Sequence, residues 1–501
     1  MTQDNNWDVI VIGGGPGGSA TATLIAMDGH KVLLLEKETF PRYHIGESLL
    51  PATIHGICAL LGVKEEVEAA GFLQKFGGTL RWGKRDDLWS FWFKDQNNLF
   101  PDRPDYAYQV ERSKFDHILL NNARKKGVDV REGCRVSEVL FEGERASGVK
   151  AIDSENREFT AHARYIVDAS GLQGLLASKI GNREYDKFFR NMALFGYYKN
   201  GKRFPEPVRR GNSISAAFNE GWFWYIPLTD ELTSVGVVVP LEHAGKISEM
   251  GMEAAFDYYV SKCPIIKEFL EPGERITEGE YGKLRVLRDF SYLNSHFWAP
   301  GAVLVGDTAC FIDPVFSSGV HLATYGALLA ARSINTCLRG ELDEEACFAE
   351  FEMRYRREYG VFYEFLLGFY EMHHDEDSYF WQARKVLNVE SNSGKEAFVQ
   401  LVAGLSSSGE PLFQDADSFI SSAKSQAQRL EQLSNAADRS KLPQQTREEV
   451  QAWGKIFFRE RLQMWRSFQS TTREGRESKE LPIFEGGLVP SNTGLHWART
   501  A

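Results

Sequence analysis

Apolar runs that end in glycine or in an acidic residue recur along the first two thirds of the chain. Residues 9–12 form such a run, and they precede a glycine-rich turn and an apolar stretch, 20–27, that can form a helix. A second run, 32–35, ends at Glu36, and later runs end at Asp168 and Asp307. Short continuous apolar runs are typical of strands buried on both faces of a parallel sheet. The pattern predicts an α/β fold with a Rossmann-type domain.

The turn after residue 12 has the spacing of a dinucleotide site. Gly13, Gly15 and Gly18 form G-x-G-x-x-G between the predicted strand and helix. Gly13 permits the tight turn, Gly15 leaves room for a pyrophosphate, and Gly18 lets the helix approach the strand. Glu36 is the expected acceptor for a ribose hydroxyl, which a glycine-rich surface turn would not explain. The other cofactor-binding residues expected here are Pro16, Ser19 and Lys37.

Polar residues at later strand ends are expected to contact the same cofactor. Arg42, Glu47 and Ser48 follow the second strand and can reach flavin or ribityl groups, although an ordinary loop ion pair is the alternative. The ends of parallel strands meet at one crevice, so later strand ends also qualify. These positions indicate FAD without indicating a reaction. The remaining contacts predicted for this cofactor are Arg112, Asp168, Gly171, Gly306, Asp307, Pro314 and Gly319.

A different pattern occupies residues 76–109 and 188–297. Aromatic residues partly alternate along 77–93, and 234–240 is the clearest strand. We expect a second, interleaved β-sheet domain on the substrate side. The predicted core covers 1–340, with nucleotide-binding parts at about 1–75, 110–187 and 298–340, and residues 341–501 form a mainly helical region. Aromatic residues spaced by three and four after Glu341 predict a helix face that packs in the core.

Composition excludes several function classes. A chain of 501 residues is too long for one hydrophobic core and favours an enzyme. The net charge of −11 without a dense basic block argues against nucleic acid as a partner. Residues 1–7 are polar and no apolar run reaches about 18 residues, so we expect a cytoplasmic protein without export signal or membrane span. The six cysteines form no C-x-x-C pair and adjacent His373 and His374 lack ligand spacing, so no metal is expected.

Two motifs narrow the reaction. Residues 222–227, Trp-Phe-Trp-Tyr-Ile-Pro, match the W-x-W-x-I-P motif of flavin-dependent halogenases, and 311–319 resemble that family's F-x-x-P-x-x-S-x-G stretch. With the glycine-rich start, the resemblance covers about residues 7–380. The run 46–51, Gly-Glu-Ser-Leu-Leu-Pro, and the run 81–83 are most similar to the halogenases of natural-product assembly, such as those for chondrochloren and chloramphenicol, rather than to the longer tryptophan halogenases.

The resemblance implies a reaction in two places. Reduced FAD, O2 and chloride give hypochlorous acid, which passes through the interior to a lysine, and Lys75 matches that lysine. A dry pocket lowers the pKa of an amine, so Lys75 can bind hypochlorous acid or form a chloramine; a solvated surface charge is the alternative. The halide is expected at Ser317, Ser318 and Gly319, where an N-cap is the alternative reading. Residues expected to screen the flavin, or to be plain core, are Trp222, Trp224, Ile226 and Pro227.

The resemblance also implies partners. No second G-x-G-x-x-G follows a strand, so a separate flavin reductase is expected to supply the reduced FAD. The expected substrate is an electron-rich aromatic ring, either phenolic or tyrosyl, free or on a peptidyl carrier protein. An aromatic hydroxylase or reductase of similar fold and a non-catalytic flavin or lipid carrier are the alternatives. The hydroxylase would couple NAD(P)H oxidation to the substrate within one chain, and the carrier has no particular use for Lys75, Trp222 and Trp224.

Overall fold

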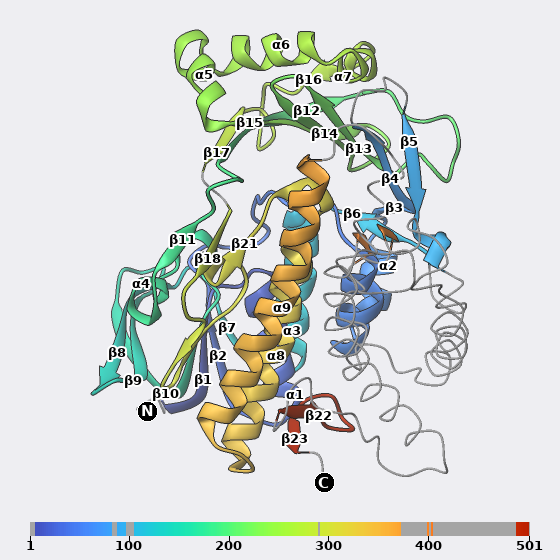
Figure 1. Cartoon of the computed structure of the whole chain (residues 1–501). Helices are drawn as coiled ribbons and strands as arrows, with labels where there is room; N and C mark the ends of the chain where they lie inside the picture. The colour runs from blue at the N-terminus through green and yellow to red at the C-terminus, as the bar shows by residue number, and fades with distance from the viewer. Residues whose placement is uncertain are drawn as a thin grey trace, which may run out of the picture.

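A mostly parallel sheet forms the first layer of the molecule (Figure 1). The computed structural model describes residues 6–82, 88–96, 105–288, 291–371, 398–399, 402–403 and 487–499. The parallel strands run in the order β20 (Ala302–Leu304), β10 (Glu158–Asp168), β1 (Asn6–Ile12), β2 (Val32–Leu35) and β7 (Asp129–Arg131). Antiparallel strands β8 (Arg135–Glu142), β9 (Arg145–Ile152) and β19 (Trp298–Ala299) extend it. The predicted Rossmann-type arrangement is confirmed.

The second sheet is assembled from two distant parts of the chain. Its order is β16 (Glu274–Arg275), β12 (Asn191–Lys199), β15 (Leu232–Pro240), β14 (Gly221–Pro227), β13 (Ser213–Phe218), β4 (Gly77–Arg81) and β5 (Trp89–Trp92), and β17 (Arg285–Arg288) pairs with β12. The helices on its outer face are α5 (Gly245–Met250), α6 (Met252–Lys262) and α7 (Pro264–Leu270) (Figure 1). The interleaved sheet was therefore predicted correctly, while the domain boundaries stay a prediction.

Long helices join the two layers. α1 (Pro16–Met27) packs against α3 (Arg112–Lys125) and α8 (Gly319–Arg339), and α9 (Glu344–Glu371) packs along α8. The aromatic face predicted after Glu341 is buried in the core, as expected: Phe348, Phe351, Tyr355, Tyr359, Phe362, Leu366 and Phe369. Beyond Glu371 most of the predicted helical region lies outside the described residues. All six cysteines are free and buried.

Several short elements lie between the longer ones. They are the helices α2 (Lys64–Ala69) and α4 (Ala177–Ile180), the pair β3 (Leu73–Lys75) and β6 (Ala107–Gln109), and the strands β11 (Arg183–Tyr185), β18 (Tyr292–Asn294) and β21 (Cys310–Phe311). The β3–β6 pair matters most for the site, because β3 ends at Lys75.

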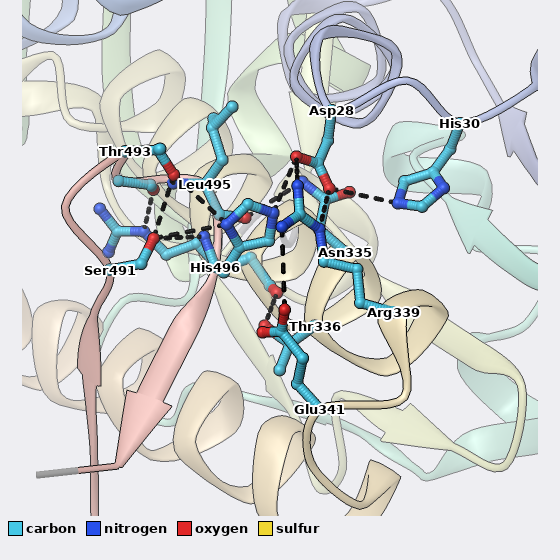
Figure 2. A network of polar contacts seen from close by, with 12 residues as sticks. Asp28, His30, Asn335, Thr336, Arg339, Glu341, Ser491, Thr493, Leu495 and His496 are labelled. Atoms are coloured by element: carbon cyan, nitrogen blue, oxygen red, sulfur yellow. Dashed lines mark hydrogen bonds and ion pairs between the residues drawn. The ribbon is translucent and has the colours of Figure 1, made fainter. Parts of the chain in front are cut away.

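A C-terminal hairpin, β22 (Leu488–Pro490) and β23 (Trp497–Arg499), returns to the first layer beside α1 and α8 (Figure 1). His496 contacts Asp28 at the end of α1, and Arg339 at the end of α8 contacts the same carboxylate (Figure 2). The ring of Trp497 is buried, and its Nε1–H donates to Ser333 at 2.8 Å. The end of the described chain is thereby fixed to helices that lie far away in the sequence.

Candidate functional site

The glycine turn between β1 and α1 has room in one place only. A Cβ on Gly13 would lie 2.4 Å from Ala169 O, and a Cβ on Gly18 would lie 1.9 Å from Gly13 O, so both positions require glycine for packing. A Cβ on Gly15 would meet only Arg42 Nη2, at 3.6 Å. Open space beside Gly15, at the N-terminus of α1, with a guanidinium opposite, fits a pyrophosphate.

The acidic end of β2 faces the same turn. Glu36 is buried, and its Oε2 accepts Gly14 N–H at 2.6 Å while Oε1 accepts Glu38 N–H at 2.8 Å. A carboxylate has about four acceptor positions, so these bonds leave capacity for a ribose hydroxyl. Pro16 opens α1, Ser19 Oγ donates to Gly14 O at 2.8 Å, and Lys37 is exposed.

Asp168 supports the loop that follows β10, and its expected contact with the cofactor stays a prediction. Its side chain is fully buried, and Oδ1 accepts Ser170 N–H at 3.0 Å and Ser170 Oγ–H at 2.6 Å. Oδ2 accepts Leu176 N–H at 2.6 Å. Both oxygens therefore shape the loop that begins at Gly171.

The turn after β20 lies next to the loop that follows β10. Gly306 has φ +69° and opens a short 3₁₀ turn that contains Asp307, and Thr308 Oγ1 donates to Gly171 O at 3.3 Å. Burial raises the pKa of Asp307 to about 6, although Arg112 and Arg183 oppose the shift. The two strand ends that the sequence predicted to share a crevice thus lie next to each other.

Two arginines hold the loop that follows β2. Arg112 Nε and Nη2 donate to Asp116 at 2.7 and 2.9 Å, and its Nη1 donates to Ile45 O at 2.7 Å. Arg42 Nη1 lies 3.2 Å from the same Asp116 carboxylate. Asp116 thereby places Arg42 near Gly15, and Arg112 fixes the loop backbone at Ile45.

Lys75 is enclosed by protein. It ends β3, its side chain is 3% exposed, and its Nζ donates to Ser48 Oγ at 2.9 Å and to Leu49 O at 3.2 Å. The Nζ also lies 5.6 Å from the centroid of the Phe93 ring. Burial lowers the pKa of this amine to about 7, so neutral and charged forms coexist near neutral pH. The reading of Lys75 as a solvated surface charge is wrong.

One small cavity joins Lys75 to the loop before α8. Its volume is about 20 Å³, close to that of one water-sized probe, and Lys75, Phe91, Ser215, Ser317 and Val402 are among the residues that line it. Val402 comes from the C-terminal part of the chain, so four separate segments enclose the space. A molecule of two heavy atoms near Ser317 therefore has a short protein-lined route toward the amine.

The loop before α8 exposes a polar group to the interior. A 3₁₀ turn, Pro314–Phe316, is capped by Asp313, whose Oδ1 accepts Val315 N–H at 3.0 Å. Ser317 follows with φ +60°, and Ser318 then occupies the N-cap of α8. The Ser318 hydroxyl is buried, makes no capping hydrogen bond and has no partner within the described chain. The helix N-terminus and this free hydroxyl suit a halide ion.

The W-x-W residues lie on β14, two positions apart, so both rings project from one face. The ring centroids of Trp222 and Trp224 are 6.2 Å apart, and Trp222 lies 6.2 Å from Trp82. Trp82 in turn contacts Phe369, which contacts Phe316 next to Ser317. A continuous aromatic wall therefore runs from β14 to the loop before α8; Pro227 is also buried, and Ile226 is half-buried.

Three partners in the site could not be identified from the sequence or were not singled out there. The contact predicted between Ser48 and the flavin stays a prediction, and the hydroxyl also accepts a hydrogen bond from the Lys75 amine, 27 residues away. Asp116 was not singled out, although its spacing of four from Arg112 on a helix is a recognisable ion-pair signal. Tyr197, which donates to Glu47 at 2.7 Å, lies 150 residues away and carried no signal.

Comparisons with known proteins agree with this geometry. A family model described as tryptophan halogenase matches residues 8–101 and 94–439. The chain is 36% identical over 420 residues to a tryptophan 2-halogenase of Chondromyces crocatus, covering 82% of this chain and 78% of the relative. A flavin-dependent halogenase of Armillaria mellea is 34% identical over 388 residues, covering 73% and 72%. The chain belongs to the flavin-dependent halogenases.

Solved structures support the same family. The myxobacterial chondrochloren halogenase CndH is 51% identical with a TM-score of 0.74, covering 98% of this chain and 100% of that one. The flavin-dependent halogenase CmlS is 33% identical with a TM-score of 0.68, covering 75% and 67%. The predicted resemblance is thus confirmed, and this halogenase is an oxidoreductase.

Family membership settles the cofactor and narrows the alternatives. Flavin-dependent halogenases use reduced FAD with chloride and O2, and they generally take the reduced flavin from a separate reductase. The hydroxylase and carrier readings accordingly lose their support. Within the described ranges, no helix is long and apolar enough to cross a membrane.

Proposed function

We propose that this halogenase chlorinates a phenolic ring of the tyrosyl type, presented on a peptidyl carrier protein, and that Lys75 directs the electrophile. The observation that carries the proposal is the cavity shared by Lys75 and Ser317. It connects an anion-binding loop to a buried amine that can hold an oxidised halide. The 51% identity to a chondrochloren halogenase supports a substrate from natural-product assembly.

The cofactor would be held by the first layer. Gly13, Gly15 and Gly18 with Arg42 would bind the pyrophosphate, and Glu36 would accept a ribose hydroxyl. Arg112 fixes the loop at 45–46, and Asp307 ends the adjacent strand. Bound reduced FAD supplies, with O2 and chloride, the hypochlorous acid used in the reaction.

The protein then controls where the halogen goes. Backbone N–H groups at Ser317–Gly319 and the Ser318 hydroxyl would hold chloride beside the flavin. The aromatic wall of Trp222 and Trp224 would keep the organic substrate away from that place. Hypochlorous acid crosses the small cavity to Lys75, which holds it by a hydrogen bond or as a chloramine. Attack by the ring forms C–Cl and releases water once the ring proton leaves.

The test uses the full chain with FAD, a flavin reductase, NADH and chloride. Three substrates are compared: a free phenol, free tryptophan, and tyrosine loaded on a peptidyl carrier protein. We expect chlorine on the phenolic ring, with faster conversion of the carrier-bound form. Chlorination of tryptophan alone would refute the phenolic assignment, and equal rates for free and bound phenol would refute the carrier. Oxygen in place of chlorine would indicate a hydroxylase.

A further inference from the structure

A buried carboxyl group lies beside the proposed flavin site. Glu47 is 2% exposed, and its Oε2 forms no hydrogen bond within the described chain. The next residue is Ser48, which accepts a hydrogen bond from Lys75. Burial raises the pKa of Glu47 to about 7, although Tyr197, Ser234 and Arg112 lower it and Glu111 raises it. A buried acid with a pKa near neutrality can both give up and take up a proton under working conditions.

Two tyrosine hydroxyls connect Glu47 to the outside. Tyr197 on β12 is fully buried, and its hydroxyl donates to Glu47 Oε1 at 2.7 Å. The hydroxyl of Tyr43 lies 2.8 Å from the hydroxyl of Tyr197, and Tyr43 is half-buried. Because Tyr197 donates inward, Tyr43 donates to Tyr197. The hydrogen bonds therefore run in one direction, from the partly exposed end to the buried carboxyl.

The surroundings keep the hydroxyls neutral and in place. Burial and the Glu47 charge raise the pKa of both Tyr43 and Tyr197. The Tyr281 ring packs 4.4 Å from Tyr197 and 6.2 Å from Tyr43, and its hydroxyl donates to Glu111 at 2.9 Å. The Arg285 guanidinium lies 3.8 Å from the Tyr43 ring centroid, near exposed Glu280. Neutral, fixed hydroxyls can pass a proton along the chain without ionising.

The inner end reaches the aromatic wall as well. The Ser234 hydroxyl, which accepts Trp224 Nε1–H at 3.2 Å, faces the Glu47 carboxyl. Glu47 thus lies between Trp224, which is proposed to screen the flavin, and Ser48, whose hydroxyl accepts a hydrogen bond from Lys75. Groups on three segments, the loop after β2, β12 and β15, converge on this one carboxyl.

We propose that Tyr43, Tyr197 and Glu47 form a proton path from the surface to the flavin site. The reaction of the family needs such a path, because each turnover consumes one proton. Reduced FAD, O2, chloride, one proton and an aromatic C–H become FAD, an aromatic C–Cl and two waters. Oxygen is reduced to water while the flavin and chloride are oxidised, and the proton ends in water. The proposal rests on the proposed flavin site but not on Lys75 or on the substrate.

The experiment measures formation of hypochlorous acid without aromatic substrate. Holoenzyme, flavin reductase, chloride and a hypochlorous acid scavenger are combined over a range of pH. We expect Glu47→Gln to lower the rate by about 100-fold and to abolish the decline in rate above about pH 7, which marks loss of the acid form. Tyr197→Phe and Tyr43→Phe should each lower it about 10-fold, since the chain is interrupted but Glu47 remains. Tyr198→Phe, the next residue on β12, packs on Phe256 and is the matched control.

A second readout needs neither flavin nor turnover. Infrared titration of the free protein should show a carboxyl band that Glu47→Gln removes and that Tyr197→Phe moves to a higher pKa, because a donor to the carboxylate is lost. FAD affinity should stay within about twofold in Tyr197→Phe and Tyr43→Phe, whereas a merely structural role of the two tyrosines would weaken it.

Wild-type rates and pH profiles in both tyrosine variants would overturn the proposal, and so would the absence of a Glu47-dependent band. Tyr43→Phe keeps the test valid if the buried Tyr197 variant folds poorly. Failure of Lys75 as the directing amine looks different, since hypochlorous acid would still form.

Discussion

Lys75 shows how burial makes an ordinary side chain reactive. A solvated lysine is almost fully charged at neutral pH, and strong hydration keeps it so. Here the Nζ has two oxygen acceptors, Ser48 Oγ and Leu49 O, and no carboxylate contact is among the causes of its lowered pKa. Desolvation is the cause of the shift toward about 7. An amine in that state can exchange a proton for a halogen.

The first prediction concerns Lys75→Ala. The variant should bind FAD, oxidise reduced flavin and release hypochlorous acid at the wild-type rate, because those steps occur in the first layer. Chlorinated product should fall at least ~100-fold, since the electrophile is no longer positioned at the ring. Flavin absorbance, a hypochlorous acid scavenger and product mass measure the three steps. The control is Lys94→Ala, an exposed lysine near Trp92 in the same region. Normal chlorination by Lys75→Ala would refute the role of this lysine.

A second prediction concerns the stability of the same site. Because the folded pKa of Lys75 lies below its usual 10.5, the folded chain binds the proton of the amine more weakly than the unfolded chain does. The free-energy cost of burying the charged amine is therefore present in full below about pH 7, and it disappears as the pH rises toward 10.5. Lys75→Met should raise the unfolding free energy near pH 7 by on the order of 2–4 kcal/mol, from about 1.4 kcal/mol per pKa unit.

Thermal melting at pH 7 and pH 10 measures this effect. The gain should be largest at pH 7 and small at pH 10, and the unpaired Ser48 and Leu49 oxygens reduce it at both values. Lys94→Met, at an exposed lysine, should show neither gain nor pH dependence. A loss of stability at pH 7 would contradict the desolvation argument.

Single residues also define the limit of sequence reasoning. Gly13, Gly15 and Gly18 could be assigned from spacing because their roles depend on local backbone geometry. Lys75 was found through a motif, but its burial depends on loops that meet it only in the fold. The hydrogen bonds of Asp168 and Ser48 were missed for the same reason, since each side chain contacts a neighbour that no local pattern specifies.

At the scale of elements, two glycines of the β1–turn–α1 unit have different purposes: Gly15 leaves space for the cofactor, and Gly18 is needed for packing of the fold. A Cβ at Gly15 has space in the protein alone, whereas a Cβ at Gly18 would lie 1.9 Å from Gly13 O. Gly15→Val should therefore fold normally but lose FAD, because its side chain occupies the place of the pyrophosphate. Gly18→Ala should lower the melting temperature even without cofactor. Flavin absorbance of the purified protein and melting of the flavin-free protein measure these effects. A Gly15→Val protein fully loaded with FAD would disprove the placement.

The strands and long helices were predictable because their patterns are periodic. The runs before Gly13, Glu36 and Asp168 became parallel neighbours, and the aromatic face of α9 became core. Pairing of β4 with β13, across more than 130 residues, was not predictable in register. Register there is decided by packing of both faces in the finished sheet, and local sequence carries little information about it.

At the scale of the whole molecule, the C-terminal hairpin stabilises the junction of α1 and α8. Asp28 accepts Arg339 at 2.6 Å and lies 2.8 Å from His496 Nε2 and 3.2 Å from His30 Nε2 (Figure 2). Arg332 Nε donates to Gly494 O at 2.7 Å, and Asn335 Nδ2 donates to Leu495 O at 3.1 Å. One carboxylate therefore connects the ends of two helices to the hairpin.

The last prediction follows from this connection. Burial raises the pKa of Asp28, but Arg339 and His496 together lower it below its usual 3.8. The contribution of Asp28 to stability is thus present above pH 3.8 and is lost as the pH falls through the folded pKa. Asp28→Asn should lower the unfolding free energy at pH 7 by ~1–3 kcal/mol, the usual value of hydrogen bonds to a charged group. The difference from wild type should shrink on acidification.

Hydrogen exchange locates that loss in the molecule. Amides of β22 and β23 should exchange faster in Asp28→Asn, whereas those of β1 and β10, which pair with each other in the first sheet, should keep their protection. The matched control is Asp129→Asn, which removes a more exposed carboxylate. Asp129 pairs with Arg131, and both residues lie on β7 of the first sheet. If Asp28→Asn loosened β1 as much as β23, Asp28 would stabilise the whole first layer instead of the hairpin. If neither changed, packing of Trp497 alone would hold the hairpin in place.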